Sequence, residues 1–225
     1  MNNLHEIISE IEEIGYYVIE NFVENIQDVR CEVEHILANV NDDSSYKFGK
    51  AFRLQPSEDT LKSYPSLKNL FLTPWFHSLA KQYLKKEQLY SEIFMTHEYR
   101  NDRGMEANGY LHFDKFSTFK YMIYLTDADE TSGAFSCVPG TRIDGQFLRE
   151  RAWAAGYEHK DIKNKPLLDY NDGCGYSIED IKPICAPAGT LIIFDTDLFH
   201  LGGRIKENNE RKLLRFHFHD GSRWS

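Results

Sequence analysis

The sequence has no long apolar run and no dense basic run, and each absence excludes a class of function. No stretch reaches the roughly 18 apolar residues that a transmembrane helix needs, so no membrane span is expected. The 35 acidic and 26 basic residues give a net charge of −9, which argues against nucleic acid or an anionic membrane as a main partner. The start of the chain is acidic and amphipathic, unlike a signal peptide, so a cytoplasmic protein is expected.

Cysteine is also scarce and shows no ligand or redox spacing. No C-x-x-C occurs, so free thiols in a reducing compartment are expected for Cys31, Cys137, Cys174 and Cys185. The chain lacks a G-x-S-x-G nucleophile motif, a Walker loop and a dinucleotide fingerprint. These absences remove the common hydrolases, the P-loop enzymes and the nicotinamide-dependent enzymes.

The first 88 of the 225 residues are expected to be mostly helical support for one domain that spans 1–225. Apolar residues recur at helical spacing, and Gly15 is a plausible stop for the first helix. Pro74 suits the first turn of a helix within the last helical region. We expect helices over 4–14, 25–39 and 67–84, a short strand over 16–19 and a polar turn over 41–50.

From about residue 89 the pattern changes to short runs of β-branched and aromatic residues bounded by Gly, Pro, Asp or Asn. Strands are expected within 89–100, 119–127, 133–139, 189–197 and 212–220. Helices first and strands afterwards predict an α+β, mainly β, chain whose strands close as a sandwich or barrel. The insertion at about 142–182 is expected to be a lid or binding loop that contains Trp153.

His112 and Asp114 are the first candidates for a metal site. Two residues apart on an extended segment, they project from the same face. With His200, after the apolar run 191–194, they would form the 2-His-1-carboxylate face of non-haem iron(II) oxygenases. His217 and His219 share a strand face and are an alternative pair, but no third ligand is evident.

Arg211 lies eleven positions after His200, far enough for a turn and a return on an adjacent antiparallel strand. An arginine there could clamp the far carboxylate of a 2-oxo acid that chelates the metal. Arg215 lies four residues further along the same strand, so its side chain points to the same face, and it is the competing candidate. A solvated charge at a strand end is the simpler alternative for Arg211.

Three stretches together resemble the phytanoyl-CoA dioxygenase-like branch of the iron(II)/2-oxoglutarate-dependent oxygenases. The stretch GYLHFDKFSTFKYMIYLTDADETSGAFSCVPGTR is similar to the family's iron-binding strand and the segments after it. The stretch PAGTLIIFDTDLFHLGG, followed by Arg211, is similar to its second half, and EEIGYYVIENFV to its N-terminal entry. The resemblance therefore covers nearly the whole chain.

The resemblance implies a double-stranded β-helix (jelly-roll) core over 89–225 with N-terminal helices packed on one sheet. It implies His112, Asp114 and His200 as iron(II) ligands and Arg211 as the 2-oxoglutarate clamp, with Lys120 or Tyr121 also candidates to contact the co-substrate. The choice between those two depends on strand register.

The activity implied by the resemblance is hydroxylation of a C–H bond in a small polar metabolite, with consumption of O2 and release of succinate and CO2. Related halogenases replace the ligand carboxylate with a small residue, so the presence of Asp114 favours hydroxylation or a desaturation-type outcome. The alternative is a non-redox, cupin-like protein that keeps the jelly roll and binds a metal or ligand. In either case the expected partner is a small molecule, and the sequence leaves the oligomeric state open.

The chain departs from the family pattern at two places. The family's P-G-S-H reads Pro139-Gly140-Thr141-Arg142, and Gly202 replaces a polar residue that often follows the distal histidine. Arg142 and Arg204 are therefore candidates to receive an anionic group of the substrate, and Trp153 is a further substrate candidate. Ordinary surface charge is the alternative for both arginines.

Overall fold

The computed structural model describes residues 3–39, 49–99, 111–154 and 176–221. The helices are α1 (Leu4–Ile14), α2 (Ile26–Asn39), α3 (Glu58–Leu61), α4 (Pro65–Phe71), α5 (Pro74–Leu84), α6 (Arg142–Ala154) and the 3-10 turn η1 (Ile178–Asp180). The strands are β1 (Tyr16–Ile19), β2 (Gly49–Leu54), β3 (Tyr90–Tyr99), β4 (Phe119–Tyr124), β5 (Phe135–Cys137), β6 (Lys182–Pro183), β7 (Leu191–Asp195), β8 (His200–Gly202) and β9 (Glu210–His219).

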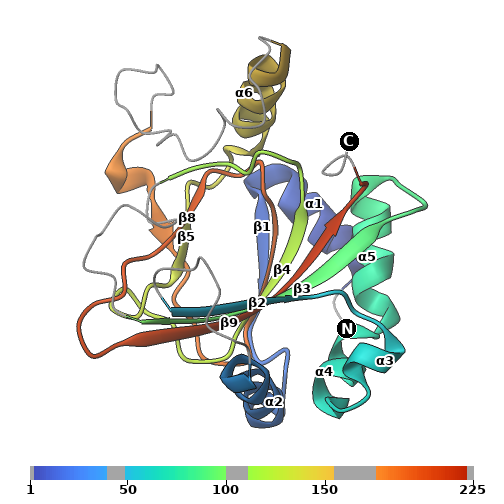
Figure 1. The fold of residues 1–225 in the computed structure, drawn as a ribbon. Coiled ribbons are helices and arrows are strands. Elements are labelled where there is room, and N and C mark those ends of the chain that lie inside the picture. The colour runs from blue at the N-terminus through green and yellow to red at the C-terminus, as the bar shows by residue number, and fades with distance from the viewer. Residues whose placement is uncertain (1–2, 40–48, 100–110, 155–175, 222–225) are drawn as a thin grey trace.

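Two antiparallel sheets form the core of the molecule (Figure 1). The larger has the strand order β1-β7-β4-β9-β3-β2, and the smaller has the order β6-β5-β8. An antiparallel bridge between His112 and His200 adds the segment around His112 to the edge of the smaller sheet. This alternation of strands between two facing sheets confirms the predicted double-stranded β-helix.

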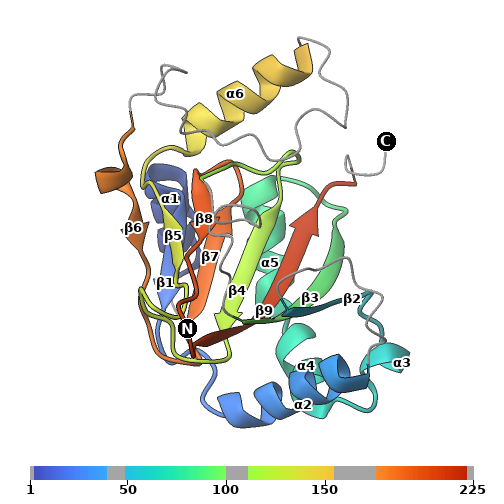
Figure 2. The ribbon, with the colours of Figure 1, turned by 60° about the vertical axis from the view of Figure 1, so that its left-hand side comes forward.

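The helices α1, α2, α4 and α5 cover the outer face of the larger sheet (Figures 1 and 2). Alternate residues of β9, Leu214, Phe216 and Phe218, belong to the same buried cluster as residues of these helices. Leu213 belongs instead to the cluster that includes Phe135 of the smaller sheet. The alternation means that the odd-numbered residues of β9 face the space between the two sheets.

Several local predictions are confirmed at residue level. Helix α1 ends at Ile14 because Gly15 adopts a left-handed backbone (φ 96°) and its N–H closes the last turn on Ile11. A side chain at Gly15 would also meet Leu198 Cδ1 at 2.6 Å. Pro74 is in the first turn of α5, as expected.

Other element predictions are wrong or incomplete. Strand β2 begins at Gly49, inside the predicted polar turn, and the short helix α3 was not predicted. The insertion at 142–182 begins with helix α6 rather than with a loop, and its residues 155–175 lie outside the described part. In the described residues, no helix has the length and apolar character to cross a membrane. Cys31, Cys137 and Cys185 are free thiols as predicted, and Cys174 lies outside the described residues.

Candidate metal and co-substrate site

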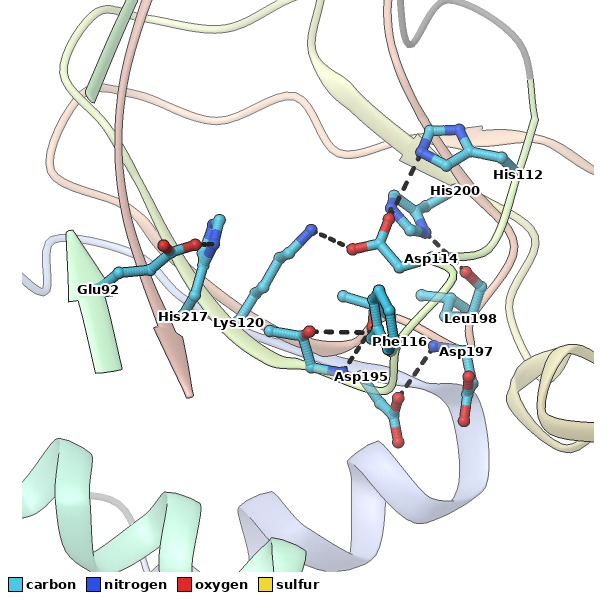
Figure 3. Close-up of polar contacts among 12 residues, drawn as sticks. Glu92, His112, Asp114, Phe116, Lys120, Asp195, Asp197, Leu198, His200 and His217 are labelled. Atoms are coloured by element: carbon cyan, nitrogen blue, oxygen red, sulfur yellow. Dashed lines mark hydrogen bonds and ion pairs between the residues drawn. The ribbon is translucent and has the colours of Figure 1, made fainter. Parts of the chain in front are cut away.

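His112, Asp114 and His200 come together between the two sheets (Figure 3). The Nε2 atoms of His112 and His200 lie 3.8 and 3.7 Å from Asp114 Oδ1, and the two imidazole rings are 4.4 Å apart. A metal ion lies about 2.1 Å from each of its ligand atoms, so two atoms that bind the same ion must lie within about 4.2 Å of each other. Each of the two Nε2 atoms meets this condition with Asp114 Oδ1. In the described residues this is the only such group of three potential ligands.

Backbone hydrogen bonds fix the two segments that carry these ligands. His112 and His200 exchange both backbone hydrogen bonds, at 2.9 and 2.8 Å, which places their side chains next to each other. The backbone N–H of Asp114 donates to the Thr196 carbonyl at 2.9 Å, which ties the first ligand segment to the turn before His200. His200 follows the end of β7, as predicted, and is also the first residue of a further strand, β8.

The protonation states suit a metal. His200 Nδ1 donates to the Leu198 carbonyl at 2.7 Å, so Nε2 keeps its lone pair for an ion. Burial, followed by the charge of His112, lowers the pKa of His200 to about 3, which keeps the ring neutral. Burial tends to raise the pKa of Asp114, but the nearby Lys120, His200 and His112 outweigh it and hold that pKa below its usual range. Two imidazoles and one carboxylate on one side of an ion are the donor set of non-haem iron(II) sites.

The register of β4 decides between Lys120 and Tyr121. Lys120 faces the space between the sheets, and its Nζ donates to Asp114 Oδ2 at 2.5 Å (Figure 3). Tyr121 faces the opposite side, is fully buried, and donates its hydroxyl to the Phe76 carbonyl at 2.7 Å. Its candidacy as a co-substrate contact is therefore corrected, because neighbouring strand residues point to opposite faces of a sheet.

Arg211 bridges the two sheets at the start of β9. Its Nε donates to Glu98 Oε2 at 2.7 Å, Nη2 also donates to Glu98, and Nη1 donates to the Gly133 carbonyl. Gly202 leaves room for this guanidinium, since a Cβ there would lie 2.9 Å from Arg211 Nη2. The guanidinium thus lies against β8, two residues after His200.

Arg215 faces the same inter-sheet space, four residues after Arg211 on β9. Its guanidinium carbon lies 4.5 Å from the centre of the Phe94 ring on β3, and that of Arg53 on β2 lies 4.4 Å from the same ring. In the neighbouring register position, His217 Nδ1 donates to Glu92 Oε1 at 2.9 Å. Glu92, Glu98 and Arg53 were not predicted as site residues. Their partners are 39 to 125 positions away, so only strand pairing could have identified them.

Arg142 and Trp153 lie on α6, which extends across one end of the sheets (Figure 2). The Nη1 atom of Arg142 is 4.0 Å from Asp195 Oδ2, and Tyr83 donates its hydroxyl to the same carboxylate at 2.6 Å. This buried carboxylate gives Arg142 a structural partner. Trp153 is 37% exposed and its ring centre lies 5.9 Å from that of Phe116, two residues after Asp114.

Three further residues were predicted as candidates: Arg204 for the substrate, and His217 and His219 as an alternative metal pair. Arg204 is exposed in the segment between β8 and β9. His217 and His219, the alternative metal pair, are not part of any group of three potential ligands in the described residues. His219 instead stacks on Tyr90 and accepts a hydrogen bond from the Gly221 N–H.

The turn before His200 contains two aspartates, Asp195 and Asp197. The backbone N–H of Asp197 donates to Asp195 Oδ1 at 2.9 Å, as expected of a turn. Asp197 also accepts two hydrogen bonds of 2.7 Å from Arg149 of α6. Burial, followed by the charge of Asp197, raises the pKa of Asp195.

Comparison with known proteins places this geometry in context. The sequence model of the Phytanoyl-CoA dioxygenase (PhyH) family matches residues 11–213. A search of curated proteins gave no match.

Among solved structures, three similar ones show the likeness of the fold. The non-heme alpha ketoglutarate dependent epimerase SnoN from nogalamycin biosynthesis has 14% identity and a TM-score of 0.60, over 97% of this chain and 83% of that one. HygX from Streptomyces hygroscopicus with nickel and 2-oxoglutarate bound has 17% identity and a TM-score of 0.64, over 95% of this chain and 85% of that one. EvdO2 from Micromonospora carbonacea var. aurantiaca complexed with 2-oxoglutarate has 13% identity and a TM-score of 0.61, over 97% of this chain and 91% of that one.

Proposed function

The chain belongs to the phytanoyl-CoA dioxygenase family, and from this premise we propose that it is an iron(II)- and 2-oxoglutarate-dependent oxygenase. We propose further that it hydroxylates a C–H bond of a small polar metabolite. The observation that carries the proposal is the convergence of His112, Asp114 and His200 with their ligand atoms within 4.8 Å of one another. The same three residues occupy the motif positions of the family's iron ligands.

In this proposal each residue has a defined task. His112 Nε2, His200 Nε2 and Asp114 Oδ1 would hold iron(II), and Lys120 holds the other oxygen of Asp114. When bound, iron(II) with 2-oxoglutarate and O2 supplies the oxidising power for C–H attack, with release of succinate and CO2. The protein positions the substrate, and the buried surroundings of His200 keep water away from the reacting groups.

Arg211 is the proposed partner of the far carboxylate of 2-oxoglutarate. Glu98 and the Gly133 carbonyl fix the plane of its guanidinium against the end of β8. An arginine fixed in this way loses little conformational freedom when it binds a carboxylate. Arg211 fits this task better than Arg215, because the guanidinium of Arg211 lies against Gly202 of β8, two residues after His200, whereas that of Arg215 lies over Phe94 of β3.

The similar structures support the cofactors but leave the reaction open. HygX was crystallised with nickel and 2-oxoglutarate, and EvdO2 with 2-oxoglutarate. SnoN, of the same fold, is described as an epimerase, so the outcome at the substrate carbon has to be measured. Incorporation of one atom of ¹⁸O2 into the product would identify a hydroxylation, and an epimerisation would leave the product without it.

Succinate release coupled to O2 uptake tests the proposal against the alternative of a non-redox, cupin-like binding protein. The wild-type chain with iron(II) is expected to convert 2-oxoglutarate to succinate in the presence of O2. His112→Ala should abolish the reaction, and Arg211→Ala should raise the KM for 2-oxoglutarate at least tenfold. Arg30→Gln is the control, since Arg30 pairs with Glu34 on α2. A wild-type chain that binds metal and releases no succinate would support the binding protein instead.

A further inference from the structure

We propose that Arg215 and His217 recognise the substrate, and that the substrate carries an oxyanion beside a hydroxyl or amino group. The oxyanion is a carboxylate, sulfate or phosphate. This inference rests on the proposed function and assigns a substrate class to the same site.

Both residues lie on β9, the strand next to Lys120, whose side chain reaches the candidate metal ligand Asp114. They are odd-numbered residues of β9, so they face the space between the sheets, and His217 lies directly opposite Lys120 of β4. Lys120 in turn donates to Asp114. Figure 3 shows His217 and Lys120 extending from neighbouring strands toward the same region beside the Asp114 carboxylate. A molecule held by Arg215 and His217 would therefore lie next to the metal.

Arg215 has the surroundings of an anion-binding arginine. The guanidinium carbon of Arg215 lies over the Phe94 ring, and that of Arg53, from the other neighbouring strand, lies over the same ring. A guanidinium binds a planar oxyanion by two parallel hydrogen bonds from the N–H groups on one edge. In Arg215 the Nε and Nη2 atoms of such an edge are buried, although the side chain as a whole and Phe94 are only partly buried.

The charge around the site favours an anionic substrate. Arg53 donates to Glu92, Lys120 donates to Asp114, and the guanidinium carbon of Arg215 lies over the Phe94 ring. A substrate oxyanion that binds Arg215 would meet a cation that stays protonated at any working pH, in a chain whose overall charge is −9.

His217 provides a second, independent requirement. Its side chain is buried (3% exposed), and its Nδ1–H donates to Glu92. Burial, which outweighs the hydrogen bond to Glu92, lowers the pKa of His217 to about 3, so the ring is neutral and Nε2 carries a lone pair. That Nε2 has no hydrogen-bond partner among the described residues. A hydroxyl or amino group of the substrate would supply the missing donor.

The first test uses inorganic sulfate as the oxyanion. Sulfate is titrated calorimetrically into the anaerobic protein loaded with iron(II) and 2-oxoglutarate, with sodium chloride at the same ionic strength as the reference. We expect saturable sulfate binding that weakens at least tenfold in Arg215→Gln, less in Arg215→Lys, and not at all in Arg30→Gln. Equal binding by wild type and Arg215→Gln, or no binding by wild type, would overturn the inference.

The second test separates a substrate oxyanion from the carboxylate of 2-oxoglutarate. In Arg215→Gln the Kd for 2-oxoglutarate is expected to change less than threefold, whereas a tenfold rise would assign Arg215 to the co-substrate and overturn the inference. Failure of the wild-type chain to bind 2-oxoglutarate would instead contradict the proposed function.

Substrate panels complete the test. Succinate release is measured with hydroxy acids, their methyl esters and the corresponding deoxy acids. Wild type should prefer the hydroxy acids, and Arg215→Gln should lose that preference over the esters. His217→Asn keeps an N–H for Glu92 and removes Nε2, so it should lose the preference over the deoxy acids. A wild-type chain that prefers the esters would contradict the inference.

Discussion

At the residue scale, the two oxygens of Asp114 have different partners. Oδ1 faces the Nε2 atoms of His112 and His200, and Oδ2 accepts the hydrogen bond from Lys120. The lysine therefore keeps one oxygen directed at the metal position. Lys120 was predicted as a co-substrate contact, and its observed contact is with a metal ligand.

Replacing Lys120 with methionine should weaken metal binding. Without the ammonium group the Asp114 carboxylate can rotate and is protonated more easily, and the loss of residues that orient a ligand typically lowers metal affinity about 10- to 100-fold. The affinity can be measured by anaerobic titration with iron(II). Lys81→Met is the control, since Lys81 is an exposed residue of α5 whose partner is Glu87. A Lys120→Met protein with wild-type affinity would show that the contact does not orient the ligand.

At the element scale, helix α6 is held against the turn that precedes His200. Arg149 makes two hydrogen bonds of 2.7 Å to the buried Asp197. Gly145 lies so close to that turn that a Cβ would be 1.8 Å from the Asp197 carbonyl oxygen. The helix and the metal-ligand segment therefore form one packed unit.

Arg149→Ala should destabilise this unit. The change leaves the Asp197 carboxylate buried without its cation, and breaking a buried pair in this way costs about 3–5 kcal/mol. The free energy of unfolding in urea measures the loss, and hydrogen exchange should locate it in α6 and the turn at 195–199. Phe147→Ala on the exposed side of α6 is the control, because that ring is 61% exposed. Similar free energies for the two variants would contradict this account of α6.

The sequence predicted those features of the fold that are encoded locally. The helical spacing and Gly15 gave α1 with its exact end, and the strand runs located β3, β4, β7 and β9. The close H-x-D pair and the distant His200 gave all three candidate ligands. Each of these depends on the period of one segment or on a motif of the family.

What could not be predicted depends on pairing between distant strands. The register of β4 determines that Lys120, and not Tyr121, faces the metal ligands. The partnership of Arg211 with Glu98 joins residues 113 positions apart. Neither the period of a single strand nor the spacing of a motif contains this information.

At the scale of the whole molecule, a chain with a net charge of −9 contains two buried histidines between its sheets. His200 and His217 are both buried, and the pKa of each is lowered to about 3, chiefly by burial. In the unfolded chain a histidine has a pKa of about 6.5. Between about pH 6.5 and pH 3, the unfolded chain therefore binds two protons that the folded chain does not.

The metal-free protein should accordingly lose stability as the pH falls below about 6.5. The two histidines together contribute a slope of about 2.7 kcal/mol per pH unit, because each contributes about 1.36 kcal/mol. The loss should continue until the pH reaches about 3. Urea unfolding of the metal-free protein at pH 7, 6 and 5 measures the slope, which His217→Asn should roughly halve. His5→Asn, at an exposed position of α1, should leave it unchanged. A flat profile over this range would mean that the two rings are protonated in the folded protein.

The anaerobic titration with iron(II) and 2-oxoglutarate tests the central claim most directly. Chelation of iron(II) by a 2-oxo acid gives a weak visible absorption band, so the wild-type chain should develop that band with saturation at one iron per chain. His112→Ala should fail to develop it, because the metal loses one of its three protein ligands. A wild-type chain without the band, or a His112→Ala chain that retains it, would contradict the assignment of His112, Asp114 and His200 as the iron site.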